Sequence, residues 1–175
     1  MEYRGYDSVG IATESENKIV VKKGVGRVVE VSNAVQLDKL PGNIGIGHTR
    51  WATHGKVTEK NAHPHLDMSG TVALVHNGII ENYKELKAEL EEHQYRFESD
   101  TDTEAVAHLI THYLTQAKAP KDAAFAAFDR LEGAYALAII FQGENNLMVG
   151  GRNGPPLAVG YGTDEMFLAS DSYAL

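Results

Sequence analysis

The sequence predicts an α+β protein in which two stacked β-sheets are covered on their outer faces by helices. β-rich runs come first, two or three helical stretches follow, and further β-rich runs close the chain. The strand-like runs are too apolar for a sheet with one face in water, which is why we expect two sheets that pack on each other. We expect one domain over residues 1–175, because that length supports a substantial core.

The composition excludes several classes of protein. The 24 acidic residues outnumber the 16 basic ones, and the net charge of −8 argues against a general nucleic-acid binder. No apolar run reaches the roughly 18 residues that a membrane span needs, and no signal peptide is recognisable. There is no cysteine, so these residues form no disulfide, thiolate metal site or cysteine nucleophile, and the cytoplasm is the expected location.

The beginning of the chain predicts a hairpin and a weak helix. Residues 9–13 and 19–23 are rich in β-formers and flank a turn-like stretch, which is typical of a hairpin. Residues 28–40 have a weakly helical pattern, and we expect Pro41 and Gly42 to end it.

Two helices are predicted in the middle of the chain. The first covers residues 82–92, with Asn82 as N-cap and Glu85 completing a capping-box pattern. The second begins at a capping box formed by Thr101 and Glu104, and its apolar residues recur at helical spacing.

A third helix and four strands complete the predicted elements. The helix begins near Pro120, packs through Phe125, Phe128 and Leu131, and is stopped by Gly133. Glycine and proline residues mark the turns between the strands that follow. These strands lie at residues 134–141, 146–149, 157–160 and 166–169.

The densest polar cluster of the sequence lies at residues 48–55, directly after an apolar run at 44–47. We expect a short buried strand that delivers these polar side chains to its end, where rigid scaffolds often present binding groups. Arg50 offers a planar fork that matches a carboxylate with two parallel hydrogen bonds. The Thr and His donors beside it could fix the rest of a small anion. A surface loop with a satisfied arginine is the alternative.

A second polar motif, His76-Asn77-Gly78, follows the apolar run at residues 71–75. That run has the composition of a strand buried on both faces, and we expect the motif at its end. An asparagine amide and a glycine N–H can both point at one oxygen and so form an oxyanion hole. A plain Asn-Gly turn after a strand is the alternative.

Asp102 lies in the first turn of the second predicted helix. Helix-terminus electrostatics alone would explain a carboxylate there, but the side chain also suits the binding of a substrate ammonium. Together, Arg50 for a carboxylate and Asp102 for an ammonium would describe a site for an α-amino acid.

Two other chemistries find little support in the sequence. His63 and His65 could bind zinc together with His48, His54 or His76, but the His-Glu-x-x-His helix is absent and we expect no metal. A serine hydrolase would need a Gly-x-Ser-x-Gly elbow, which the sequence lacks.

Five motifs, in this order, resemble the glutaminase domain of glucosamine-6-phosphate synthases. Those enzymes, the glutamine–fructose-6-phosphate aminotransferases (isomerising), are class II, N-terminal-nucleophile glutamine amidotransferases. Related domains in asparagine synthetase and amidophosphoribosyltransferase are similar in fold. The motifs lie at residues 4–8, 48–55, 61–65, 76–82 and 101–104.

The resemblance implies a four-layer αββα sandwich of the N-terminal-nucleophile hydrolase type. It also implies a glutamine site. Arg50 and Thr53 would hold the carboxylate of L-glutamine, and Asp102 would hold its α-ammonium. Asn77 and Gly78 would form the oxyanion hole.

Four further residues, and the partners of the domain, also follow from the resemblance. Trp51 would help to close the site and to gate ammonia, and Arg4 would help to position the nucleophile region. His54 and His63 match family positions near the glutamine site. No metal or organic cofactor is implied. The ammonia would pass to a sugar-isomerase half that converts fructose 6-phosphate to glucosamine 6-phosphate.

The chain departs from the family at the nucleophile. In the family the first residue is a cysteine whose own α-amine is the general base. Met1 stands first here, and its thioether sulfur has no proton to lose. We therefore expect a fragment without the first strand and helix and without the sugar-isomerase half, with little turnover of its own. An unpaired strand edge would favour a homo-oligomer. The alternatives are a non-catalytic amino-acid binding module and the glutaminase domain of another class II amidotransferase.

Overall fold

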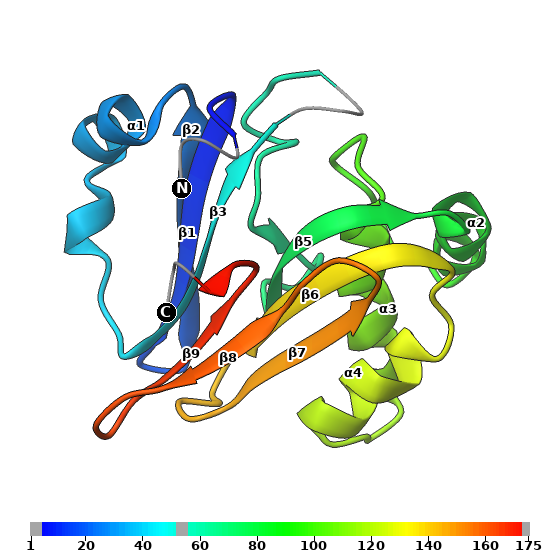
Figure 1. The fold of residues 1–175 in the computed structure, drawn as a ribbon. Helices are drawn as coiled ribbons and strands as arrows, with labels where there is room; N and C mark the ends of the chain where they lie inside the picture. Colours follow the sequence, from blue (N-terminus) through cyan, green and yellow to red (C-terminus); the bar gives the residue numbers. More distant parts are fainter. Residues whose placement is uncertain (1–4, 52–55, 173–175) are drawn as a thin grey trace.

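The computed structural model describes residues 5–51 and 56–172, which form four layers (Figure 1). A helix covers one face of a three-stranded sheet, the other face of that sheet packs on a four-stranded sheet, and three helices cover the far side. This αββα order is the predicted α+β sandwich.

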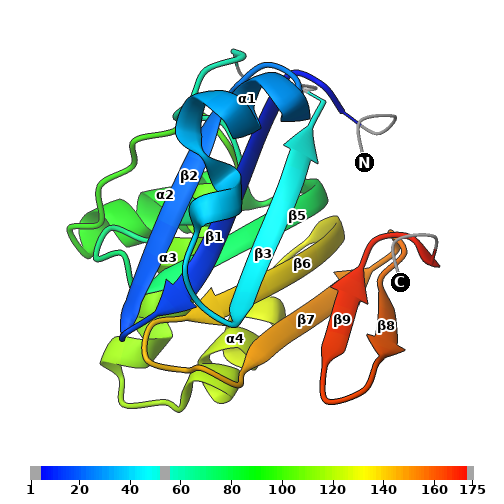
Figure 2. The same cartoon turned by 90° about the vertical axis from the view of Figure 1, so that its left-hand side faces the viewer.

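The first sheet has the strand order β2-β1-β3 and is antiparallel throughout. Its strands are β1 (Ser8–Ser15), β2 (Lys18–Val25) and β3 (Ile44–Arg50), and the β1–β2 pair confirms the predicted hairpin. Helix α1 (Val28–Val35) and a short 3₁₀ turn, η2 (Leu37–Lys39), cover its outer face (Figure 2). A small apolar cluster joins these layers; its buried members are Val9, Val31 and Leu37.

The second sheet has the order β4-β5-β6-β7 and carries most of the core. Its strands are β4 (His65–Leu66), β5 (Val72–Ile80), β6 (Gly133–Phe141) and β7 (Met148–Asn153). Its outer face packs against helices α2 (Tyr83–Glu92), α3 (Thr103–Thr115) and α4 (Pro120–Phe128). A short hairpin of β8 (Ala158–Tyr161) and β9 (Met166–Ala169) follows.

The alternation of side chains explains why residues 72–75 of β5 and most of β6 are apolar on both faces. Leu74 and Leu137 point to the helices, whereas Ala73 and Ala138 point to the first sheet. Both faces of these strands are therefore buried, as the run at residues 71–75 predicted. Between the two sheets, alanines of β1, β5 and β6 pack together with the larger Ile46 and Ile140.

Both polar motifs begin inside strands rather than after them. Strand β3 continues as far as Arg50, which is paired with Ser8 of β1. The prediction that His76-Asn77-Gly78 follow the end of a strand was wrong, because these residues are paired with β6 and the strand continues to Ile80. The ladder with β6 holds the motif more rigidly than a turn would.

Both predicted capping boxes were wrong, because the side chains bond elsewhere. Neither Asn82 nor Asp102, the residues at the N-caps of α2 and α3, caps its helix through its side chain. The Asn82 amide instead joins the segment between α4 and β6, by donating to the carbonyl of Arg130 and accepting from the N–H of Glu132. Glu104 accepts from backbone N–H groups of the segment that precedes its helix.

The third helix is shorter than predicted. Helix α4 does begin at Pro120, but it ends at Phe128, five residues before the predicted stop at Gly133. Of its three predicted packing residues, Leu131 and Phe128 do join the core, whereas Phe125 is 45% exposed and the prediction for it was wrong. Among the residues that the structure describes, no helix has the length and apolar character needed to cross a membrane.

Candidate active site

A pocket of about 440 Å³ lies where the ends of β3 and β5 meet the beginning of α3. It brings together residues that are far apart in the sequence, and six of them were predicted site residues. These six are Arg50, Trp51, His63, Asn77, Gly78 and Asp102.

Arg50 is the cation of the pocket. It lies at the end of β3, is 6% exposed, and its Nη1 donates to the carbonyl of Lys56 at 3.3 Å. Burial lowers the pKa of the guanidinium, and the carboxylates of Asp7 and Asp102 oppose that shift. A charged guanidinium with little water around it binds a carboxylate more strongly than an exposed one would.

Asn77 is oriented by a histidine from the other sheet. Nε2 of His48 lies 2.9 Å from Oδ1 of Asn77, and an amide oxygen can only accept, so the imidazole donates. Burial lowers the pKa of His48 to about 4, so the ring is neutral at pH 7. Because its oxygen is occupied, Asn77 presents its amide nitrogen as the donor group.

Gly78, the next residue of β5, must be a glycine. Its φ is +124°, in the region that L-residues with a side chain rarely adopt. A Cβ at this position would also collide with the carbonyl oxygen of Ala134 on β6. The backbone of β6 therefore fills the place where a side chain of residue 78 would otherwise stand.

Asp102 is the anion of the pocket and is held by β5 rather than by its own helix. Its Oδ2 accepts from the N–H of Ile80 at 2.8 Å, and the hydroxyl of Thr103 donates to Oδ1 at 3.3 Å. Nδ1 of His76 lies 3.9 Å from Oδ2, but burial lowers the pKa of His76 even though the carboxylate opposes that shift. The Asp102 side chain remains 21% exposed, so a ligand can reach it.

Three buried imidazoles line the inner part of the pocket. The rings of His48 and His63 are stacked at 4.4 Å, and burial holds the pKa of His63 well below its usual value. Within the described part of the chain, Nδ1 of His48, Nδ1 of His63 and Nε2 of His76 have no hydrogen-bond partner. All three nitrogen atoms are themselves buried.

The remaining predicted site residues are at the rim of the pocket or outside the described residues. Trp51 is 58% exposed and its ring lies 5.5 Å from that of Tyr6. Arg4, Thr53 and His54 fall on residues 1–4 and 52–55, which the structure does not describe. Among the residues that it does describe, no group of three His, Asp or Glu side chains is placed to share a metal ion.

Sequence reasoning missed the orienting role of His48. The residue attracted attention only as one of several possible zinc ligands. Its partner, Asn77, lies on the other sheet and 29 residues further along the chain, so no local pattern joins them.

A family profile for the glutamine amidotransferase domain matches residues 48–175. The chain belongs to the glutamine amidotransferase family. The matched segment contains every element of the pocket, from the polar end of β3 to the beginning of α3.

Two curated relatives match this amidotransferase chain over its whole length. Both are named glutamine–fructose-6-phosphate aminotransferase [isomerizing]. The protein from Gluconobacter oxydans is 56% identical, and the one from Bartonella henselae is 52% identical. The chain spans only 29% and 28% of the lengths of these two relatives.

Solved structures of amidotransferases share the fold. The Bacillus subtilis glutamine phosphoribosylpyrophosphate amidotransferase, complexed with ADP and GMP, has a TM-score of 0.83 and 32% identity over 98% of this chain and 37% of its own. A structure described as the allosteric regulatory enzyme of purine biosynthesis has a TM-score of 0.84 and 31% identity, over 99% and 37% of the two chains. These likenesses confirm the predicted N-terminal-nucleophile fold.

Proposed function

We propose that this chain is the glutaminase part of a glutamine–fructose-6-phosphate aminotransferase, and that its pocket binds L-glutamine. The observation that carries the proposal is one pocket that holds a buried cation, Arg50, a reachable anion, Asp102, and an oriented amide donor, Asn77. An α-amino acid with a side-chain carbonyl presents the three complementary groups. The two relatives at 56% and 52% identity support this choice of enzyme.

In this proposal each group of glutamine has a partner. Arg50, with Thr53 beside it in the sequence, holds the α-carboxylate, and Asp102 holds the α-ammonium. The amide nitrogen of Asn77 and the backbone N–H of Gly78 stabilise the negative charge that develops on the side-chain oxygen. Because His48 already occupies Oδ1 of Asn77, the donor does not have to be oriented during the reaction.

Four further assignments rest on the family resemblance and are part of the same proposal. Trp51 closes the site at its rim and gates ammonia, and Arg4 positions the segment that carries the nucleophile. His63 and His54 lie near the bound glutamine; of these, His63 lines the pocket.

The chemical step needs a thiol that these 175 residues do not contain, since there is no cysteine. A thiolate would attack the side-chain carbonyl carbon of glutamine, release ammonia and form a thioester, which water would then hydrolyse to glutamate. In the proposed enzyme that ammonia is used by the sugar-isomerase part to convert fructose 6-phosphate to glucosamine 6-phosphate. We expect the 175-residue chain to bind glutamine without turning it over.

A second function is favoured by that same absence of cysteine. A non-catalytic module would keep the charged pocket, to bind an amino acid, and would need no nucleophile. The two functions differ in the full-length polypeptide, which turns glutamine over in the first case and only binds it in the second.

Calorimetric titration with L-glutamine tests the proposal. We expect this chain to bind L-glutamine and to bind D-glutamine at least about 10-fold more weakly, because the two enantiomers place the ammonium differently. Arg50→Ala should lower the affinity about 100-fold or more, since it removes a buried charge partner.

Arg130→Ala is the matched control, because Arg130 forms an exposed ion pair with Glu89 instead. Equal affinities of the Arg50→Ala variant and the unmodified chain would overturn the assignment of the carboxylate. If the full-length protein binds glutamine but releases no glutamate, the glutaminase proposal is wrong and the non-catalytic binding module is the better description.

Two expectations about the surroundings of the protein complete the proposal: it resides in the cytoplasm and it self-associates. The exposed apolar side chains of the β8–β9 hairpin support self-association, since Tyr161 is 80% exposed and Met166 is 66% exposed. Sedimentation of the full-length protein as a monomer would overturn this part.

A further inference from the structure

Asn61 joins the two segments that carry the opposite charges of the pocket. It is 1% exposed and is not among the residues that line the pocket. Its Nδ2 donates to the carbonyl of Lys56 at 3.0 Å and to Oδ2 of Asp100 at 3.3 Å. Its Oδ1 accepts from the N–H of Asp100 at 2.9 Å. One buried amide therefore ties residue 56 to residue 100.

The Lys56 end of this connection leads to Arg50. The same carbonyl oxygen that accepts from Asn61 also accepts from Nη1 of Arg50. A carbonyl that is fixed by Asn61 therefore fixes one nitrogen of the guanidinium.

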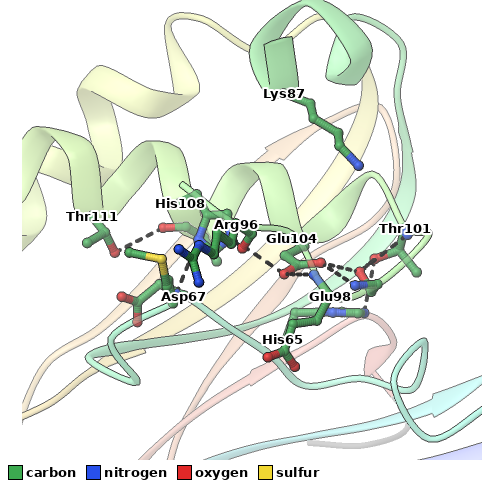
Figure 3. Close-up of polar contacts among 12 residues, drawn as sticks. His65, Asp67, Lys87, Arg96, Glu98, Thr101, Glu104, His108 and Thr111 are labelled. Atoms are coloured by element: carbon green, nitrogen blue, oxygen red, sulfur yellow. Dashed lines mark hydrogen bonds and ion pairs between the residues drawn. The ribbon is translucent and has the colours of Figure 1, made fainter. Parts of the chain in front are cut away.

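The Asp100 end leads to Asp102, two residues further along the chain. The segment before Asp102 is also held from the side of α3, where the Glu104 carboxylate accepts from the N–H of Glu98 at 2.9 Å and of Ser99 at 2.7 Å (Figure 3). The hydroxyl of Thr101 in turn lies 3.0 Å from that of Ser99. The segment is therefore held by Glu104 on one side and by Asn61 on the other.

We propose that Asn61 is a positioning residue that sets the spacing between Arg50 and Asp102, and so selects ligands that carry both an α-carboxylate and an α-ammonium. The inference rests on the proposed function, because it assumes that these two residues bind glutamine. Asn61 touches no substrate in this arrangement; it acts through Lys56 on one side and through Asp100 on the other.

The bonding pattern requires an amide at this position. Asn61 donates to Lys56, and it both donates to Asp100 and accepts from it, which an alanine cannot do at all. An aspartate would keep an acceptor for the N–H of Asp100, but it would lose the bond to Lys56 and would face the Asp100 carboxylate. Since the site is buried, each lost bond leaves an unpaired polar group.

The test compares three ligands on the unmodified chain and on Asn61→Ala by calorimetry. The ligands are L-glutamine, 4-carbamoylbutanoate, which lacks the α-amine, and 4-aminobutanamide, which lacks the carboxylate. A ligand with one charge binds one of the two residues and does not depend on the spacing between them. We expect Asn61→Ala to lower the affinity for glutamine about 10-fold or more and the affinity for either analogue less than about 3-fold.

Asn82→Ala is the matched control, because the Asn82 amide also donates to one backbone carbonyl and accepts from one backbone N–H, in the segment between α4 and β6. It should lower thermal stability while leaving the preference for glutamine over the analogues unchanged. If Asn61→Ala does not fold, Asn61→Asp should show the same selective loss, since it cannot donate to Lys56.

The possible results distinguish a wrong role for Asn61 from a wrong assignment of the glutamine site. An equal loss for all three ligands, or a change in glutamine affinity below about 2-fold, would overturn the role of Asn61 and leave the glutamine site in place. Failure of the unmodified chain and of the full-length protein to bind glutamine would overturn both.

Discussion

The two walls of the pocket are built differently. The first wall is the end of β3, with Arg50 and Trp51, and the second wall is formed by β5 and the beginning of α3, with Asn77 and Asp102. The second wall rests on the large core between the four-stranded sheet and its helices. The first wall belongs to a sheet whose outer face is covered by one short helix and a 3₁₀ turn through a small cluster.

The hydrogen bonds of the two walls differ in the same way. Asp102 is held by the N–H of Ile80, and the segment before it is gathered by the Glu104 carboxylate. Nη1 of Arg50 donates to the carbonyl of Lys56, which lies in a loop and which Asn61 connects to the second wall. We infer that the second wall is the rigid reference of the site and that the first wall is placed relative to it.

Truncation of the core under each wall should have the largest effect on stability, and an unequal one. Leu109→Ala, under the second wall, should lower the free energy of unfolding by about 3–4 kcal/mol, because it leaves a cavity in a fully buried cluster. Val31→Ala, under the first wall, should cost about 1–2 kcal/mol, because it removes less volume from a smaller cluster. Denaturant unfolding measures both, and equal losses would contradict the difference between the walls.

Loss of the Glu104 carboxylate should have the next largest effect. Burial raises the pKa of this group, but hydrogen bonds from His108, Ser99 and Glu98 outweigh it and lower the pKa to about 2. A pKa lowered by that much corresponds to about 3 kcal/mol in the free energy of unfolding. This stabilisation is present above pH 4.5 and is lost as the pH falls towards 2. Glu104→Gln should remove about that stability at pH 7 and flatten the acid dependence over this window. The exposed Glu89→Gln should cost less than about 1 kcal/mol.

The buried histidines should make stability fall at higher pH than Glu104 does. Burial lowers the pKa of His48 to about 4 and that of His65 to about 3, from 6.5. Below pH 6.5 the unfolded chain binds protons that the folded chain cannot, so stability should fall from there down to pH 3–4. His65→Gln should make the decrease between pH 7 and pH 5 shallower in thermal unfolding. An unchanged slope would mean that His65 takes up its proton in the folded chain.

The rim of the first wall should contribute least to stability. Trp51 is mostly exposed, so Trp51→Ala should change the free energy of unfolding by less than about 0.5 kcal/mol. If the change exceeds about 1.5 kcal/mol by denaturant unfolding, the first wall is packed more firmly than we infer.

Sequence reasoning predicted the layers and the charged groups of the pocket, because both leave local signals. Strands β5 and β6 are apolar on both faces, and that pattern requires a cover on each side. Arg50 and Asp102 stand out by their charge and by their places beside predicted elements.

The hydrogen bonds that orient the site were not predictable, because their partners are distant in the sequence. Asn82 has the pattern of a helix cap, but its hydrogen-bond partners lie 48 and 50 residues further along the chain, after α4. Asn61 and Asp100 are 39 residues apart, and His48 and Asn77 are on different sheets. These side chains make tertiary contacts in place of the local ones that their sequence patterns predict.

A crystal structure of this chain grown with L-glutamine would show directly how the pocket binds its ligand. We expect glutamine between the two walls, with its carboxylate on Arg50, its ammonium on Asp102 and its side-chain oxygen within hydrogen-bond distance of Nδ2 of Asn77. Glutamine bound with its carboxylate away from Arg50, or bound at another place on the chain, would contradict this expectation.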